Sequence, residues 1–186
     1  VVLNGQIIEY NRRELIFRVQ FPDTVRRLSA DNIVAYAPER NQAHQQAVQA
    51  LKDLQYNEAL SKFASAQSQE TRPWLQREIQ AGQIEVLINQ QNWLEAVEKY
   101  LTLINSDPLT RHQELIPLHW SDEKLTNEEK IWALGALQSN KAIERLIGTS
   151  WLVESTEYGT RAESMLREMM TNPDPLIRHL TKTQIW

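Results

Sequence analysis

Residues 56–63 read YNEALSKF, and residues 93–100, which begin 37 positions later, read WLEAVEKY. Each segment has an aromatic residue, then Glu-Ala, then a second aromatic residue four positions after the alanine. A segment that recurs at a period of roughly 20–50 residues indicates stacked helical hairpins. Such hairpins build binding surfaces more often than active sites. The two segments therefore predict a fold and a class of function, and they name no ligand.

The length and the charge of the chain limit the classes of protein to which it can belong. The chain has 186 residues, which favours one domain or one domain with a small appendage. It carries 20 basic and 24 acidic residues, a net charge of −4, whereas nucleic-acid binding needs a basic face. We therefore expect no nucleic-acid partner. No apolar run approaches the ~20 residues of a membrane helix, so we expect no membrane span.

The absence of cysteine excludes disulfides, thiolate nucleophiles and thiolate metal sites. It does not decide the compartment, which is either the cytoplasm or an exported location reached after removal of a signal peptide. The chain begins Val-Val-Leu without an initiator Met, so we interpret it as a fragment or a processed form.

The first 37 residues differ from the rest. Segments 6–10, 15–19 and 32–36 are short and rich in β-branched and aromatic residues. They predict a meander of three or four strands, with separators at 11–13 and 22–24. A sheet this small needs a partner surface, so we expect one face to pack on the helices or on a second copy of the chain.

The remaining pattern is helical. Pro38 opens a first helix, and its apolar stripe predicts that Ala47, Ala50 and Leu54 point inward. Asn57 is the expected cap of the second helix. Thr126 and Glu129 have the spacing of a capping box. The predicted helices cover residues 39–54, 58–69, 72–90, 93–105, 127–138, 140–153, 157–171 and 175–184, with an irregular stretch at 108–125.

Residues 40–108 resemble two tetratricopeptide repeats. The first unit matches the family's motif at Tyr56, Ala59, Phe63 and Ala66, and the second matches it at Trp93, Ala96, Tyr100 and Pro108. Alanine lets two antiparallel helices approach closely, while the aromatic rings fill the space between hairpins. The layout is also similar to bacterial repeat proteins that carry a short N-terminal β module.

The resemblance implies a mostly α fold, an array of antiparallel helical hairpins preceded by a small β meander. We expect three parts: a β module at 1–37, two hairpins at 38–107, and an irregular connection with further helices at 108–186 that continue or cap the stack.

In tetratricopeptide domains the ligand lies in a concave groove lined by the first helix of each hairpin. The resemblance places six residues there: Asn41, His44 and Lys52 from the first unit, and Glu78, Glu85 and Asn89 from the second. Polar side chains along one helix face suit a peptide. The alternative is that these residues form a solvated face, or that other parts of the chain cover the groove.

A second candidate surface is dense in charge around an aromatic ring, at Arg72, Trp74 and Arg77. Trp and Arg dominate interaction hot spots. Ion pairs along a helix start, with the indole in the core, explain the same residues without a partner.

Catalytic motifs are not found in this sequence. No two of the four histidines are three or four positions apart, and no phosphate loop or nucleophile elbow is found. We expect no metal, no cofactor and no enzymatic activity. The favoured hypothesis is a non-catalytic interaction or scaffold module that binds a protein or peptide.

Two alternatives remain open. The chain could be a structural protein that forms homo-oligomers through its β module. It could also be an enzyme with an unrecognised site in residues 108–125, where His112, Glu114, His119 and Asp122 gather.

Overall fold

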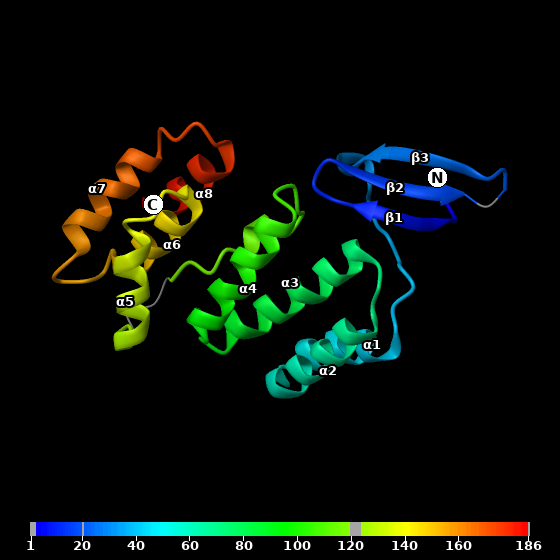
Figure 1. Cartoon of the computed structure of the whole chain (residues 1–186), viewed down its shortest axis with the longest axis horizontal. Helices are drawn as coiled ribbons and strands as arrows, with labels where there is room; N and C mark the ends of the chain where they lie inside the picture. The colour runs from blue at the N-terminus through cyan, green and yellow to red at the C-terminus, as the bar shows by residue number, and fades with distance from the viewer. Residues whose placement is uncertain (1–2, 20, 120–123, 186) are drawn as a thin grey trace. The chain divides into compact units, whose positions relative to one another are not determined.

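A computed structural model describes residues 3–19, 21–119 and 124–185, with side chains up to residue 182. The chain is mostly helical, with a small antiparallel sheet near its N-terminus, as predicted (Figure 1). It forms two compact units, Val1–Leu115 and Ile116–Trp186. The strands and the first hairpins, which the sequence assigns to separate parts, thus belong to one compact unit.

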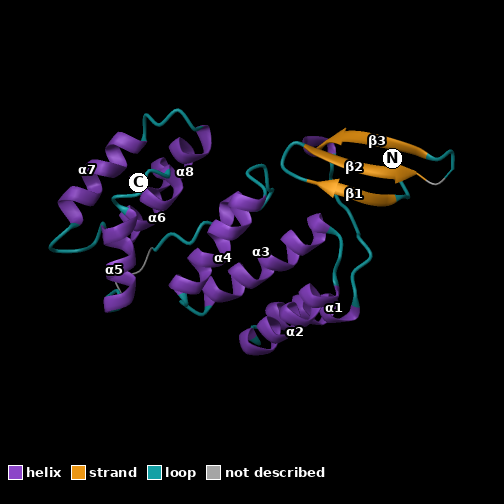
Figure 2. Ribbon diagram, viewed as in Figure 1, coloured by secondary structure: helices purple, strands orange, loops and turns teal. Residues whose placement is uncertain are grey.

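The sheet has three antiparallel strands in the order β1-β2-β3: β1 (Gln6–Tyr10), β2 (Glu14–Val19) and β3 (Thr24–Ser29) (Figure 2). The side chain of Asn11 shapes the first turn, because its Oδ1 accepts the N–H groups of Arg13 (2.9 Å) and Glu14 (3.1 Å). The first two predicted strands are confirmed.

The prediction of a strand at 32–36 is wrong, since the third strand is β3. This strand reads TVRRLS and is largely exposed, so it lacks the apolar alternation that marks a half-buried strand. A single 3₁₀ turn covers Ala30–Asn32, and the chain then runs without regular structure to residue 41. There Ile33 and Tyr36 pack against the sheet core, while Val34 is fully exposed.

One face of the sheet packs on the helices of the same unit, as one of the two expected arrangements. Tyr10, Leu15 and Phe17 form a cluster with Trp74 and Leu75 at the start of α3. The indole Nε1 of Trp74 donates to the carbonyl of Ile7 at 3.2 Å. The sheet therefore gains the apolar support that three short strands cannot supply.

Two helical hairpins follow: α1 (Gln42–Lys52) with α2 (Tyr56–Gln69), and α3 (Pro73–Asn89) with α4 (Trp93–Ser106). The helix α1 begins later than predicted, because Asn41 caps it by accepting the N–H of His44 at 2.8 Å. The predicted cap Asn57 lies inside the first turn of α2, so that prediction is wrong.

The turns after α1 and α3 have the same backbone geometry. Leu54 and Gln91, which are 37 positions apart, both have φ of 59°. Each turn has the paired hydrogen bonds of a Schellman motif, Gln55 N–H to Ala50 (2.8 Å) in the first and Asn92 N–H to Leu87 (2.9 Å) in the second. A residue with a side chain in this left-handed conformation costs about 1–2 kcal/mol.

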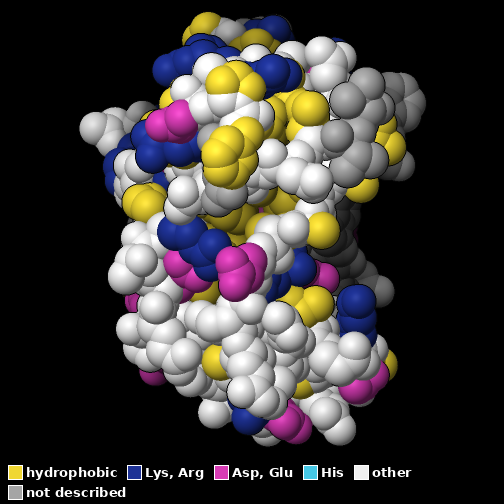
Figure 3. Space-filling model, turned by 90° about the vertical axis from the view of Figure 1, so that its right-hand side faces the viewer, with side chains coloured by type: hydrophobic (Ala, Val, Ile, Leu, Met, Phe, Trp, Pro, Cys, Tyr) yellow, Lys and Arg dark blue, Asp and Glu magenta, His cyan; other side chains and the backbone are white. Residues whose placement is uncertain are grey.

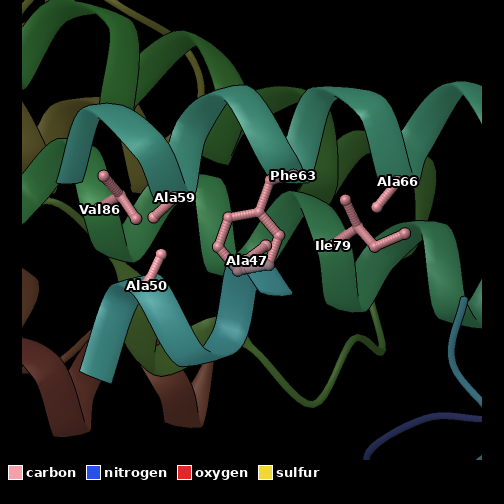
Figure 4. Packing of buried hydrophobic residues seen from close by; sticks show 7 residues of the cluster. All are labelled: Ala47, Ala50, Ala59, Phe63, Ala66, Ile79 and Val86. Atoms are coloured by element: carbon pink, nitrogen blue, oxygen red, sulfur yellow. The ribbon is translucent and has the colours of Figure 1, made fainter. Parts of the chain in front are cut away.

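Small residues bring α1, α2 and α3 together. Figure 4 shows the Phe63 side chain pointing from α2 into the space between α1 and α3. The buried cluster around it consists of Ala47, Ala50, Ala59, Phe63, Ala66, Ile79 and Val86. The prediction that Ala47 and Ala50 point inward is confirmed. Leu54 is 68% exposed, so its predicted burial is wrong.

The second unit holds α5 (Asn127–Ala136), α6 (Ala142–Leu152), α7 (Gly159–Met169) and α8 (Pro175–Ile185). The predicted capping box is confirmed, because Thr126 Oγ1 accepts the Glu129 N–H (3.2 Å) and Glu129 Oε2 accepts the Thr126 N–H (2.7 Å). Trp151 donates to the carbonyl of Pro117 at 2.9 Å and thereby holds the connecting segment of this unit.

Gly82 on α3 tests the close packing of the first unit. A Cβ at this position would lie 2.3 Å from the Phe63 ring, so Gly82→Ala should lower the free energy of unfolding by about 2 kcal/mol. Gly135→Ala is the control, since a Cβ there meets nothing within 4 Å. Urea unfolding of both variants checks this, and equal effects would contradict it.

Candidate binding groove

The first unit contains a groove of about 650 Å³ between α1 and α3, which we call the α1–α3 groove. Half-buried apolar residues of α1 and Tyr56 at the start of α2 contribute apolar surface, and charged side chains surround it. Its lining consists of Tyr36, Arg40, His44, Val48, Leu51, Lys52, Leu54, Tyr56, Phe63, Glu78, Ala81, Gly82, Glu85, Asn89, Arg111, His112, Glu114 and Leu115.

Helix periodicity explains why one face of α1 and one face of α3 line the groove. His44, Val48 and Leu51 recur at intervals of one turn on α1, and Glu78, Glu85 and Asn89 recur along one face of α3. Five of the six groove candidates, His44, Lys52, Glu78, Glu85 and Asn89, line this groove together.

The sixth candidate, Asn41, does not line the groove, because its side chain makes hydrogen bonds at the start of α1. Its Oδ1 caps α1, and its Nδ2 donates to the carbonyl of Ala66 on α2 at 3.3 Å. It thus joins the start of α1 to the end of α2.

A charged and aromatic cluster occupies the part of the groove around Glu78. The side chain of Glu78 is only 7% exposed, and its carboxylate accepts a hydrogen bond from the Tyr36 hydroxyl. The guanidinium groups of Arg40 and Arg111 each lie 3.5 Å from this carboxylate. Burial and the bond to Glu78 raise the pKa of the Tyr36 hydroxyl well above its usual range, so Tyr36 remains a hydrogen-bond donor.

Arg111 also stacks on two rings of the same cluster. Its guanidinium carbon lies 4.3 Å from the Tyr10 ring centroid and 4.8 Å from that of Tyr36. The two rings meet edge to face with centroids 5.0 Å apart. The cluster therefore connects β1, the segment before α1, the helix α3 and the segment after α4.

Two histidines line the groove in their neutral form. Burial and the neighbouring Arg40 lower the pKa of His44 to about 4, and burial with Arg111 and Arg77 lowers that of His112 to about 4. His44 is 2% exposed, and its Nδ1 is buried without a hydrogen-bond partner. Neutral imidazoles make this part of the groove less cationic than the count of basic groups indicates.

Two of the three hot-spot candidates, Trp74 and Arg77, contact the sheet, whereas Arg72 pairs with its neighbour Glu70. Arg72 holds the Glu70 carboxylate through Nε (2.7 Å) and Nη2 (2.8 Å), which lowers the pKa of Glu70 to about 2. Trp74 is 2% exposed. Arg77 pairs with Glu9 and with Asp107, whose Oδ2 lies 3.1 Å from its Nε.

The residues of the proposed catalytic loop are distributed over both units. His112 and Glu114 line the α1–α3 groove, whereas His119 is a buried residue of the second unit. Asp122 lies outside the described residues. In the described part of the chain, no three metal-ligating side chains gather in one place, and no helix is both long and apolar enough to span a membrane.

Sequence reasoning missed three groove residues that lie in segments without regular structure. Tyr36 was placed in a strand, and Arg40 and Arg111 were not singled out. Arg111 comes to Glu78 from 33 positions away, through a segment without periodicity. Only the contacts reveal these residues, because neither spacing nor motif marks them.

Charge in the groove is balanced. Its lining includes three cationic residues, Arg40, Lys52 and Arg111, and three carboxylates, Glu78, Glu85 and Glu114. Within the described residues, Lys52, Glu85 and Glu114 make no ion pair, and all three are exposed. The groove thus offers unpaired charges of both signs beside apolar surface.

The shared carboxylate gives a prediction. Glu78→Gln should lower the free energy of unfolding of the first unit by about 2 kcal/mol, because two partly buried guanidinium groups lose their counter-charge. Glu14→Gln, which breaks the exposed pair with Arg27, should change it by less than about 1 kcal/mol. Denaturant titration measures both, and a larger loss for Glu14→Gln would contradict the assignment.

The histidines predict a pH dependence. Because their pKa values fall from 6.5 in the unfolded chain to about 4, the folded chain binds fewer protons and loses stability as the pH falls below 6.5. Each histidine should lower the free energy of unfolding by about 2 kcal/mol at about pH 5. The carboxylate of Glu70, whose pKa is about 2, remains ionised at this pH and does not contribute to the loss. His44→Gln should remove about half of this loss in unfolding measured between about pH 5 and pH 7. An unchanged slope would exclude His44 as a cause.

The chain was compared with protein-family models, with curated proteins and with solved structures, and none of them matches it. Support for a function therefore comes from the residues of the α1–α3 groove.

Proposed function

We propose that the chain is a non-catalytic protein-interaction module of tetratricopeptide type, and that its α1–α3 groove binds a segment of a partner protein. The observation that carries this proposal is the composition of the groove. Apolar surface from Val48, Leu51 and Tyr56 lies beside exposed, unpaired charges of both signs. An extended peptide offers the same mixture of apolar side chains, charges and main-chain polar groups.

The two hairpins support the tetratricopeptide type. Both end their first helix in the same turn at positions 37 apart, and Ala59 and Ala96 occupy the same place after each turn. Both alanines are fully buried, as close approach of two helices requires. The groove lies on α1 and α3, the first helices of the two hairpins, where the family resemblance implies a ligand.

A second candidate function, assembly through the sheet, has one favourable observation. Phe21 and Val25 are 91% and 54% exposed beside the free edge of β3. Figure 3 shows basic and hydrophobic side chains together on the upper part of this face, at the height where Figure 1 draws the sheet. However, antiparallel pairing of two β3 strands about their centre would bring Arg26 opposite Arg27, which is unfavourable. We therefore favour the groove.

Selection from a phage-displayed random peptide library tests the proposal. Peptides selected on the native chain should bind at least about tenfold more weakly to the double variant Lys52→Glu/Glu85→Lys, which reverses both exposed charges and keeps the net charge. The control is Glu58→Lys/Lys62→Glu, a matched exchange on α2 outside the groove lining.

Isothermal titration with the selected peptides measures the two effects. Equal affinity for the native chain and the groove variant would contradict the proposal, and so would a selection that enriches no peptide. Circular dichroism of each variant confirms that the helices are retained, and light scattering measures whether the native chain is a monomer.

A further inference from the structure

Leu54 combines two unfavourable properties at the edge of the α1–α3 groove. Its φ of 59° lies in the left-handed region, where glycine is the usual residue after a helix. Its side chain is also 68% exposed, although leucine is among the residues most often buried. Folding of this turn therefore does not explain why a leucine stands there.

The second hairpin provides an internal comparison. Gln91 has the same φ and the equivalent turn hydrogen bonds, but it is polar and does not line the groove. The backbone geometry is thus common to both turns, while the exposed apolar side chain is particular to the first. Both turns therefore contain a strained left-handed residue, but only the first turn places an apolar side chain at the groove.

The surroundings of Leu54 extend the apolar surface of the groove to its rim. Val48, Leu51 and Tyr56 line the same groove, and all three are half-buried and pack against the cluster around Phe63. Beside this apolar strip, Lys52 on α1 and Glu85 on α3 carry charges without an ion pair in the described chain.

We propose that Leu54 is the apolar anchor of the α1–α3 groove and contacts a large aliphatic or aromatic side chain of the bound partner peptide. The inference rests on the proposed function and specifies its ligand. Besides this apolar residue, the peptide carries an acidic group that complements Lys52 and a basic group that complements Glu85. Contact with the peptide would remove the exposed surface of Leu54 from water, which favours binding.

Paired glycine variants separate the turn from the binding role. Leu54→Gly and Gln91→Gly should both raise the melting temperature by about 2–4 °C, because each relieves the same left-handed strain. Only Leu54→Gly should weaken binding of the peptides selected from the phage library, by about tenfold in Kd, equivalent to about 1.4 kcal/mol.

Two further variants test the chemistry at position 54. Leu54→Met keeps a large apolar side chain and should bind within about threefold of the native chain, since volume-conserving apolar exchanges are tolerated. Leu54→Asn tolerates the left-handed conformation without the flexibility of glycine, and it should bind as weakly as Leu54→Gly. The selected peptides should be enriched in large apolar residues and should carry charges of both signs.

The outcomes distinguish this inference from the proposed function. If the peptides depend on Lys52 and Glu85 but bind Leu54→Gly as well as the native chain, the anchor is overturned and the function stands. If no peptide is selected, both are overturned. A lower melting temperature for Leu54→Gly, or a change from dimer to monomer in light scattering, would assign Leu54 to the fold or to a second copy and overturn the anchor.

Discussion

The carboxylate of Glu78 is the point on which the first unit depends. It accepts from the Tyr36 hydroxyl and faces the guanidinium groups of Arg40 and Arg111, so the segment before α1 and the segment after α4 meet at one side chain of α3. Arg111 in turn stacks on Tyr10 of β1. A small sheet needs a hydrophobic face or a helix to pack against, and this cluster joins the sheet to the hairpins beside the apolar contact at Trp74. The same cluster forms part of the groove, so the stability of the unit and the shape of the candidate site depend on the same residues.

Local patterns predicted the helical hairpins well, because their signals lie within a few turns of chain. The Ala and aromatic spacing around Ala59 and Phe63 reports a buried helix face, and Thr126 with Glu129 reports a helix start. The sheet was harder to predict from the sequence. β3 is an exposed edge strand with polar side chains, whereas Ile33 and Tyr36 are apolar anchors in a segment without regular structure. Hydrophobic alternation marks burial, and it identifies strands only where burial and strand coincide.

In the candidate site, too, residues on regular helices could be predicted, whereas residues in irregular segments could not. The resemblance to tetratricopeptide repeats named six residues on the regular faces of α1 and α3, and five of them line the groove. Tyr36, Arg40 and Arg111 come from irregular segments, whose positions depend on contacts far along the chain. Leu54 was assigned to the buried stripe because it continues the spacing of Ala47 and Ala50. The left-handed turn redirects it outward, since one residue with positive φ ends the helical periodicity.

The glycine at position 82 affects the shape of the groove, because it leaves room for the ring of Phe63. The tip of the Phe63 ring occupies the space in which a Cβ of residue 82 would lie, so this ring of α2 packs directly on the backbone of α3. Both residues line the groove. Its depth is therefore set by an aromatic ring pressed against bare backbone, a contact that no larger residue at 82 can reproduce. Substitutions at exposed positions such as Lys52, Glu85 and Asn89 can alter the chemistry of the groove while this depth stays constant.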